Sequence, residues 1–478
     1  MTDQGLLLAA VLLPLVGALL FLPYFERFLG KISRFISVIP LFLSVCCSVA
    51  MLPGVYQGNP AAIHWQLPYG LDFGFQADGL ALFMALYVSI LGIVVIFYSW
   101  GYMSGKPERN RYHLLLSAFI GGILGMVYAD NLLLIYLFGQ VAVLSSWRLI
   151  AFWGGKEREV RGGKVLLMLS AGLILMFVAF LVIYHIYGTF SLPALVGMGA
   201  NHVVMILMVC GILTQCAIVP FHSWLMNVGS APAPATALLE GAVLVQMGVY
   251  LFARIFLVHM VMPSIWHYII PIIATISSLL AAGVAFVEKD MIRALSYGTV
   301  SQVGLLIFGL ACSSPMSVAG AMLGMVTLGS ANAVLYLCAG TVEARIQTRN
   351  LNEMDGLARL MPVTHIAFLV ATLSLIGIPP FVGFWDKYFV IAGAIEAGYL
   401  WQAALFIVCS FITVIYLLRI YTKIFLGPIR YADVKAGSWE MVTAVVLVAV
   451  AIVGLGIFIN GPVSLLQVIV GAMGGVVA

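Results

Sequence analysis

Charged residues are scarce in this sequence, and their scarcity excludes most classes of soluble protein. Only 8% of the 478 residues are Asp, Glu, Lys or Arg, whereas a soluble domain carries about 25%. The seven cysteines show no CxxC spacing and no neighbouring histidine cluster, so neither a zinc nor an iron–sulfur site is expected. No glycine-rich nucleotide motif follows a candidate strand. These absences argue against a cytosolic enzyme, a nucleic-acid binder, a secreted disulfide scaffold and any cofactor or metal site of the chain's own.

Hydrophobic residues, by contrast, make up 63% of the chain. No water-soluble fold of this length could bury so much apolar surface, so the lipid bilayer must be the solvent. A spanning helix needs about 20 apolar residues, and about fourteen segments qualify. We therefore predict an all-α polytopic membrane protein. The candidate spans lie near 6–24, 34–53, 80–101, 113–129, 131–153, 164–187, 203–228, 236–258, 266–287, 293–311, 317–340, 364–394, 402–425 and 441–475.

The positions of the basic residues predict the orientation. Twenty of the 22 Lys and Arg residues, among them Arg27, Lys31 and Lys435, fall in odd-numbered connections between the spans. Cytoplasmic connections carry an excess of Lys and Arg, so we expect these connections to be cytoplasmic. A multi-pass protein of the cell inner (plasma) membrane follows, with both termini on the non-cytoplasmic side. The two exceptions are Arg254 and Lys387.

Proline interrupts two of the predicted spans. Pro220 lies in the seventh, and Pro379 and Pro380 lie in the twelfth. Proline removes a backbone donor, and in lipid a broken helix is tolerated where it lines a cavity. If spans 4–8 and 9–13 form two five-helix units, each break falls in the fourth helix, which is the inverted-repeat pattern of ion transporters. The predicted divisions are N-terminal spans 1–3 in 1–112, a first repeat in 113–260, a second repeat in 261–430 and a C-terminal helix in 431–478.

Seven short motifs occur in order along almost the whole chain. They are DGLALF with YSWGYM at 78–83 and 98–103, PFHSWL at 220–225, ALL and GVY at 237–239 and 248–250, DMIRALSY at 290–297, SQVG at 301–304, MDGL at 354–357 and GIPPFVGF at 377–384. On these motifs the chain resembles the antiporter-like subunits of respiratory complex I, of Mrp-type cation/proton antiporters, and of group 4 hydrogenases and formate hydrogenlyases.

The resemblance implies a row of titratable residues at mid-membrane, through which protons move in two half-channels. Here the sequence departs from the family pattern, because four carrier positions hold amides: Gln140, Gln215, Gln246 and Asn332. An amide can orient water but cannot exchange a proton as a carrier must. With Gln140 opposite Gln215, the first ion pair that the resemblance implies is absent. We therefore expect the first half-channel to be electrostatically silent, because its side chains cannot change their charge.

Four ionisable residues remain as candidates for an ion pathway. Glu240, early in the eighth span, is either a replacement proton carrier or a helix-start carboxylate favoured by the helix dipole. His222, at the first break, is either a relay or a hydrogen-bonded structural histidine. Lys387 follows the second break and has either a proton-exit or ion-pair role, or a structural role in holding that break. Asp386 precedes it, and adjacent helical residues point about 100° apart.

Two classes of function remain open. The chain is either an antiporter-like subunit in the H⁺ or Na⁺ translocation arm of a multi-subunit redox complex, with its own conduction impaired or absent, or a non-pumping structural spacer. Membership of another coupled complex, such as one for inorganic-carbon uptake, is a third possibility. The expected partners are the lipid bilayer and other membrane subunits. Any oxidoreductase chemistry would belong to those subunits, because the chain shows no nucleophile, metal or cofactor pattern.

Overall fold

The structure is a computed structural model that describes residues 3–21, 33–67, 71–106, 108–431 and 437–472. Arg27, Lys31 and Lys435, which entered the orientation prediction, lie outside these ranges. The first helices are α1 (Asp3–Leu19), α3 (Ser33–Tyr56), α4 (Gly79–Tyr102), α5 (Arg109–Tyr128), α6 (Leu132–Ile150), α7 (Lys156–Tyr187) and α8 (His202–Gln215). Those that follow are α9 (Leu225–Val228), α10 (Ala233–Thr236), α11 (Leu244–Phe252), α12 (Trp266–Val287), α13 (Met291–Ala311), α14 (Pro315–Ile346), α15 (Pro362–Ile376), α16 (Val382–Glu396), α17 (Leu400–Phe425), α18 (Trp439–Ile457) and α19 (Asn460–Ala472).

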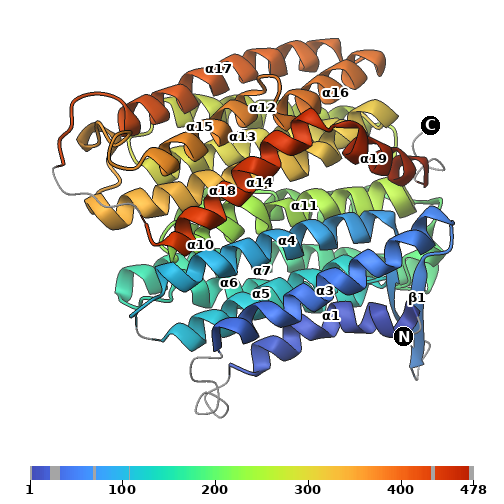
Figure 1. Ribbon diagram of the computed structural model, residues 1–478. Coiled ribbons are helices and arrows are strands. Elements are labelled where there is room, and N and C mark those ends of the chain that lie inside the picture. Colours follow the sequence, from blue (N-terminus) through green and yellow to red (C-terminus); the bar gives the residue numbers. More distant parts are fainter. Residues whose placement is uncertain (1–2, 22–32, 68–70, 107, 432–436, 473–478) are drawn as a thin grey trace. The chain divides into compact units, whose positions relative to one another are not determined.

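The helical membrane class is confirmed (Figure 1). Within the described ranges, 11 helices are long and apolar enough to span a bilayer, and further apolar helices are shorter. Several of the shorter helices are pieces of spans that the sequence analysis marks as single segments. The predicted seventh span is divided into α8, η4 (Phe221–Trp224) and α9, and the twelfth into α15 and α16.

Local sequence signals account for where several buried helices begin. At the start of α14, the Ser314 side chain accepts a hydrogen bond from the Ser317 N–H at 3.1 Å, and Pro315 occupies the first helical turn. At the start of α13, the Asp290 carboxylate accepts one from the Arg293 N–H at 3.0 Å. Serine and aspartate are favoured caps because they satisfy free N–H groups, and proline tolerates the first turn.

Both proline breaks contain irregular backbone. Val219-Pro220 and Pro379-Pro380 are cis peptide bonds. Gly377 ends α15 with φ +90°, a conformation that favours glycine. At the first break, the Val219 N–H donates to the Ser277 hydroxyl at 3.0 Å, which satisfies one backbone donor that the helix leaves free.

The predicted eighth span is not a uniform α-helix. It runs from α10 through η5 (Ala237–Ala242), a π-helical segment, into α11, and then into η6 (Ala253–His259), a second π-helical segment. π-Helical turns are rare and are frequent at functional sites. Glu240 lies in η5, and Arg254 and His259 lie in η6, so both π-helical segments carry buried ionisable side chains.

The chain divides into two compact units. Unit 1 comprises 1–96, 103–215 and 250–263, and unit 2 comprises 97–102, 216–249 and 264–478. In unit 1, α5 packs against α6, α7 against α8, and α1 against both α3 and α5. The same unit holds an antiparallel hairpin of β1 (Ala61–Leu67) and β2 (Leu71–Ala77), and a parallel pair of β3 (Met198–Gly199) and β4 (Met260–Val261). These strands are not among the elements predicted from the sequence.

In unit 2, α14 contacts α13, α15, α16 and α18, and α12 packs against α13 and α17. Most of the side chains of α14 are buried, although it is 32 residues long. A helix that is enclosed on so many sides can hold polar residues away from lipid, because its neighbours supply their hydrogen-bond partners. The division into inverted repeats at 113–260 and 261–430 stays a prediction.

Candidate functional site

Glu240 is the centre of a polar cluster inside unit 2. Its side chain is 0% exposed, and one carboxylate oxygen, Oε2, accepts a hydrogen bond from the Ser296 hydroxyl of α13. The Tyr336 hydroxyl of α14 also interacts with this carboxylate. The second oxygen, Oε1, has no hydrogen-bond partner in the described part of the chain. A buried carboxyl group that is only partly satisfied in a membrane interior is a functional-site candidate.

The cluster continues from Glu240 along α13 and α14. The Tyr336 hydroxyl lies 3.5 Å from the Ser296 hydroxyl and 3.5 Å from the Thr299 hydroxyl. The Asn332 amide donates to the Thr299 hydroxyl at 3.0 Å. Hydroxyl groups both donate and accept hydrogen bonds, so they can pass a proton along, whereas Asn332 can only orient its neighbours. We call these five residues, Glu240, Ser296, Thr299, Asn332 and Tyr336, the Glu240 cluster.

Gln246 lies in the same unit and contacts the same helix, α14. Its amide donates to the Met325 carbonyl at 2.8 Å, and its own buried Oε1 has no partner among the residues that the structure describes. Tyr336, Asn332 and Met325 are spaced by four and seven residues, so they share one face of α14. Gln246 therefore reaches the backbone of α14 about two turns before Asn332.

Asp386 and Lys387 form a second cluster in unit 2, just after the second break. They are 4% and 8% exposed, and the Lys387 Nζ lies 3.9 Å from the Asp386 Oδ1. Thr327 of α14 interacts with the Asp386 carboxylate. A cavity of about 10 Å³ is lined by Gln302, Thr327 and both charged residues, which is about the size that admits one water molecule. We call Asp386, Lys387, Thr327 and Gln302 the Lys387 cluster.

The Lys387 side chain also reaches the edge of its unit. It contributes to the wall of a groove of about 640 Å³ between α15, α16 and α17. A Cβ atom on Gly377 would lie 2.9 Å from the Lys387 Cδ, so the lysine stem occupies space that any side chain at Gly377 would need. The break therefore provides both the backbone turn and the room for the one basic side chain of this cluster.

The amide positions of unit 1 contain no charge. The Gln215 amide, 3% exposed, donates to the Leu169 carbonyl of α7 at 3.0 Å. Gln140 on α6 is half-buried, and no hydrogen bond joins it to Gln215 within the part of the chain that the structure describes. Gln215 is held by backbone, and neither residue can change its charge. The prediction that this first pair is silent rests on these neutral side chains.

His222 lies apart from both clusters. It is half-buried, its ring centroid is 6.0 Å from that of Tyr297, and its Nδ1 has no hydrogen-bond partner among the described residues. The structure therefore brings together Glu240 with Asn332, and Asp386 with Lys387, but gives His222 no contact with either pair. Its role as a relay stays a prediction.

Unit 1 contains a charged cluster that the sequence analysis missed. Arg254 in η6 is 0% exposed and forms an ion pair with Asp78, which precedes α4. Asp130 is 1% exposed, and its Oδ2 lies 3.6 Å from the Nδ1 of the half-exposed His64. We call His64, Asp78, Asp130 and Arg254 the Arg254 cluster. The available signal was Arg254 itself, one of two basic residues outside the predicted cytoplasmic connections.

Burial sets the protonation behaviour of Asp130, which lies between α5 and α6. Burial raises the pKa of this carboxyl from 3.8 to about 6, against the opposing effects of Arg254 and His64, which lower it. A buried carboxylate is costly to ionise because it loses hydration. Asp130 therefore keeps its proton to a higher pH than an exposed aspartate does.

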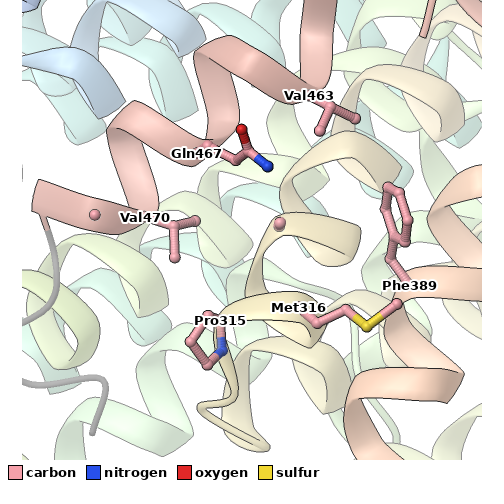
Figure 2. Close-up of a pocket in the computed structure, with 8 residues that line it drawn as sticks. Pro315, Met316, Phe389, Val463, Gln467 and Val470 are labelled. Atoms are coloured by element: carbon pink, nitrogen blue, oxygen red, sulfur yellow. The ribbon is translucent and has the colours of Figure 1, made fainter. Parts of the chain in front are cut away.

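A further groove in unit 2 carries no such chemistry. Figure 2 shows this cavity of about 440 Å³, where Pro315 and Met316 of α14 face Val463 and Val470 of α19. Of its eight lining residues, Gln467 alone has a hydrogen-bonding side chain. A groove with so apolar a lining suits a hydrocarbon group better than an ion. Among the described residues, no group of three His, Cys, Asp or Glu side chains could hold a metal.

Two sequence profiles match the chain. That of the NADH:quinone oxidoreductase/Mrp antiporter transmembrane family covers residues 129–413. That of the complex I NADH-ubiquinone oxidoreductase chain 5 N-terminus covers residues 66–113. Together they include both breaks and all four amide positions.

Curated relatives agree with these profiles. The chain is 31% identical over 82% of its length to a probable K⁺/H⁺ antiporter subunit of Rhizobium meliloti, of which it covers 40%. It is 28% identical over 95% of its length to a Na⁺/H⁺ antiporter subunit of Staphylococcus haemolyticus, of which it covers 61%. It is 30% identical over 88% of its length to a chloroplast NAD(P)H-quinone oxidoreductase subunit 5 of Nasturtium officinale, of which it covers 60%. The chain thus spans about half the length of these relatives.

Solved structures share the fold. A chain of the Mrp complex from Dietzia sp. superposes with a TM-score of 0.87 at 21% identity, over 100% of this chain and 98% of that one. A chain of the membrane-bound sulfane sulfur reductase, an archaeal respiratory membrane complex, gives 0.88 at 20% identity, over 99% and 100%.

Proposed function

Because this chain belongs to the NADH:quinone oxidoreductase/Mrp antiporter transmembrane family, we propose that it is an antiporter-like subunit in the membrane arm of an energy-converting complex. Its relatives include subunits of cation/proton antiporters and of a quinone oxidoreductase. The coupled ion is H⁺ or Na⁺, and the redox chemistry belongs to other subunits. Its basic residues favour an orientation in which both termini lie on the non-cytoplasmic side.

The ion conduction of this subunit is impaired, and the defect lies in unit 1. The observation that carries this proposal is the pair of neutral side chains, Gln140 and Gln215, at positions where the family has titratable groups. The Gln215 amide donates a hydrogen bond to a backbone carbonyl. Because an amide does not take up or release a proton, it cannot store charge or change the charge state of a neighbour. A proton cannot be held at this position during transfer.

Residual conduction is confined to unit 2. Glu240 takes up a proton, and the hydroxyls of Ser296, Tyr336 and Thr299 connect it toward Asn332. Water at the open Oε1 of Gln246 continues the path to the Lys387 cluster, whose cavity has room for about one water molecule. Lys387 is the charge-storing end of this path, because it can exist as ammonium or amine while Asp386 compensates its charge.

The test is proton flux through the chain purified with its co-purifying membrane subunits and reconstituted in liposomes. An imposed pH gradient drives the flux, and a pH-sensitive dye inside the vesicles reports it. Glu240→Gln and Lys387→Gln repeat the kind of change that this chain already has at four positions. Each should lower the flux at least about tenfold, the factor that corresponds to 1.4 kcal/mol. A Na⁺ gradient in a parallel experiment identifies the ion.

The second candidate function is a non-pumping spacer. The neutral amides favour it, as does the mutual compensation of Asp386 and Lys387. If this function is correct, both substitutions leave the flux unchanged while the complex stays assembled, as judged by size-exclusion chromatography. A lowered flux with normal assembly rejects the spacer.

A further inference from the structure

Arg349 lies in the short segment just after the C-terminal end of α14, in unit 2. It follows α14 and precedes η7 (Leu351–Glu353). Its Nε donates to the Glu343 carboxylate at 2.6 Å, and its Nη2 donates to the Gly229 carbonyl at 2.9 Å. The Arg349 side chain is 30% exposed. One guanidinium group therefore contacts both the partly exposed surface and the backbone that covers the Glu240 cluster.

The remaining nitrogen of Arg349 lies near the unsatisfied oxygen of Glu240. A Cβ atom placed on Gly229 would be 3.6 Å from the Glu240 Oε1 and 3.8 Å from the Arg349 Nη1, so these two atoms are at most 7.4 Å apart. Gly229 has φ −57°, which any residue can adopt. Its lack of a side chain is therefore not needed for the backbone conformation. The Cγ2 methyl of Ile292, 2.7 Å from that Cβ position, fills the space instead, beside the two charged groups.

We infer that Arg349 is a positioning residue that controls proton access to Glu240 by moving between the Glu343 and Glu240 carboxylates. The inference rests on the proposed role of Glu240 as a proton carrier. When Glu240 is ionised, its free Oε1 attracts the guanidinium, which then covers the carboxylate. When Glu240 is protonated, Arg349 stays on Glu343, as in the structure, and the guanidinium leaves the Glu240 carboxyl group uncovered.

Arginine suits this role because it keeps its charge under all physiological conditions and presents several donors from one planar group. The acidic groups that act on Arg349 are Glu343 on α14, Asp290 at the start of α13, and Glu240 in η5. Asp290 is already occupied as the cap of α13, where it accepts from the Arg293 N–H. The competition for Arg349 is therefore mainly between Glu343 and Glu240.

Infrared spectroscopy of the full chain with its co-purifying subunits in lipid tests the inference. The carboxyl C=O band that disappears in Glu240→Gln reports the protonated form of Glu240, and its shift in D₂O reports the rate of proton exchange. Arg349→Gln removes the cover and should speed exchange at least about tenfold. Glu343→Gln releases Arg349 toward Glu240 and should slow exchange at least about threefold. Arg349→Lys keeps the positive charge and should restore most of the slow exchange.

Arg430→Gln is the matched control. Arg430 also pairs with a carboxylate at 2.7 Å, that of Asp355, and is half-exposed, but it does not contact the Glu240 cluster. It should leave the exchange rate unchanged. If Arg349→Gln and Glu343→Gln also leave the rate unchanged while the band is present, the inference is wrong and the proposed function stands. If no band disappears in Glu240→Gln at any pH, Glu240 does not carry a proton, and both are overturned.

Discussion

Removing one partner of the buried ion pair between Arg254 and Asp78 should destabilise the fold strongly, and substitution of Asp78 by Asn measures this cost. The Asp78 carboxylate has two roles, since Oδ1 caps α4 by accepting from the Ala81 N–H at 2.9 Å and Oδ2 pairs with Arg254. Asparagine is as good a cap as aspartate, so Asp78→Asn removes the charge and keeps the cap. Arg254 is then left 0% exposed without its partner.

Breaking a buried pair in this way costs about 3–5 kcal/mol. We expect about 3 kcal/mol, at the lower end, because Asp130 still acts on Arg254. The free energy of unfolding in detergent, followed by loss of helical circular dichroism, measures this cost. Replacing the arginine as well, in Asp78→Asn/Arg254→Met, should recover more than half of it, since no uncompensated charge stays buried. A cost below about 1 kcal/mol, which is typical of an exposed pair, would show that Arg254 is not held as a buried charge that needs Asp78.

Three further predictions concern other polar sites. Asp130 binds its proton more tightly in the folded than in the unfolded protein, because its pKa is raised from 3.8 to about 6. The free energy of unfolding should therefore fall by about 3 kcal/mol as the pH rises from about 3 to about 7. Asp130→Asn should remove that part of the decline in pH-dependent thermal unfolding. Gly377→Ala should lower the free energy of unfolding more than Gly398→Ala does. Both glycines have φ near +90°, but only an alanine side chain at position 377 would clash with Lys387. Equal losses would contradict this contact. Ser296→Ala removes a hydroxyl that donates to the buried Glu240 carboxylate, so it should lower the free energy of unfolding by about 1–3 kcal/mol, measured by thermal unfolding. An unchanged free energy of unfolding would indicate that a water molecule replaces the hydroxyl.

The spans and the breaks could be predicted because they depend on local sequence. A run of apolar residues is enough to mark α12 or α13, and prolines mark the places where α8 and α15 end. Helix ends were less predictable. The π-helical segments within the eighth span have no strong sequence signal, because they depend on how the buried neighbours pack.

The charged contacts could not be predicted, because they join residues far apart in the sequence. Arg254 stood out as a basic residue away from the cytoplasmic connections, but its partner Asp78 is 176 positions away. For Glu240 the sequence left two interpretations open, a carrier or a helix-start carboxylate. Its complete burial and its bond to Ser296 favour the first, since a carboxylate that only responds to the helix dipole would stay close to water.

The most direct test of the account compares proton flux between two double variants of the reconstituted chain with its co-purifying subunits. Gln140→Ala/Gln215→Ala alters the neutral pair of unit 1, and Glu240→Gln/Lys387→Gln removes the two proposed proton carriers of unit 2. We expect the first variant to keep nearly all of the wild-type flux and the second to lose at least about 90% of it, a tenfold drop. A tenfold loss in the first variant, or an unchanged flux in the second, would contradict it.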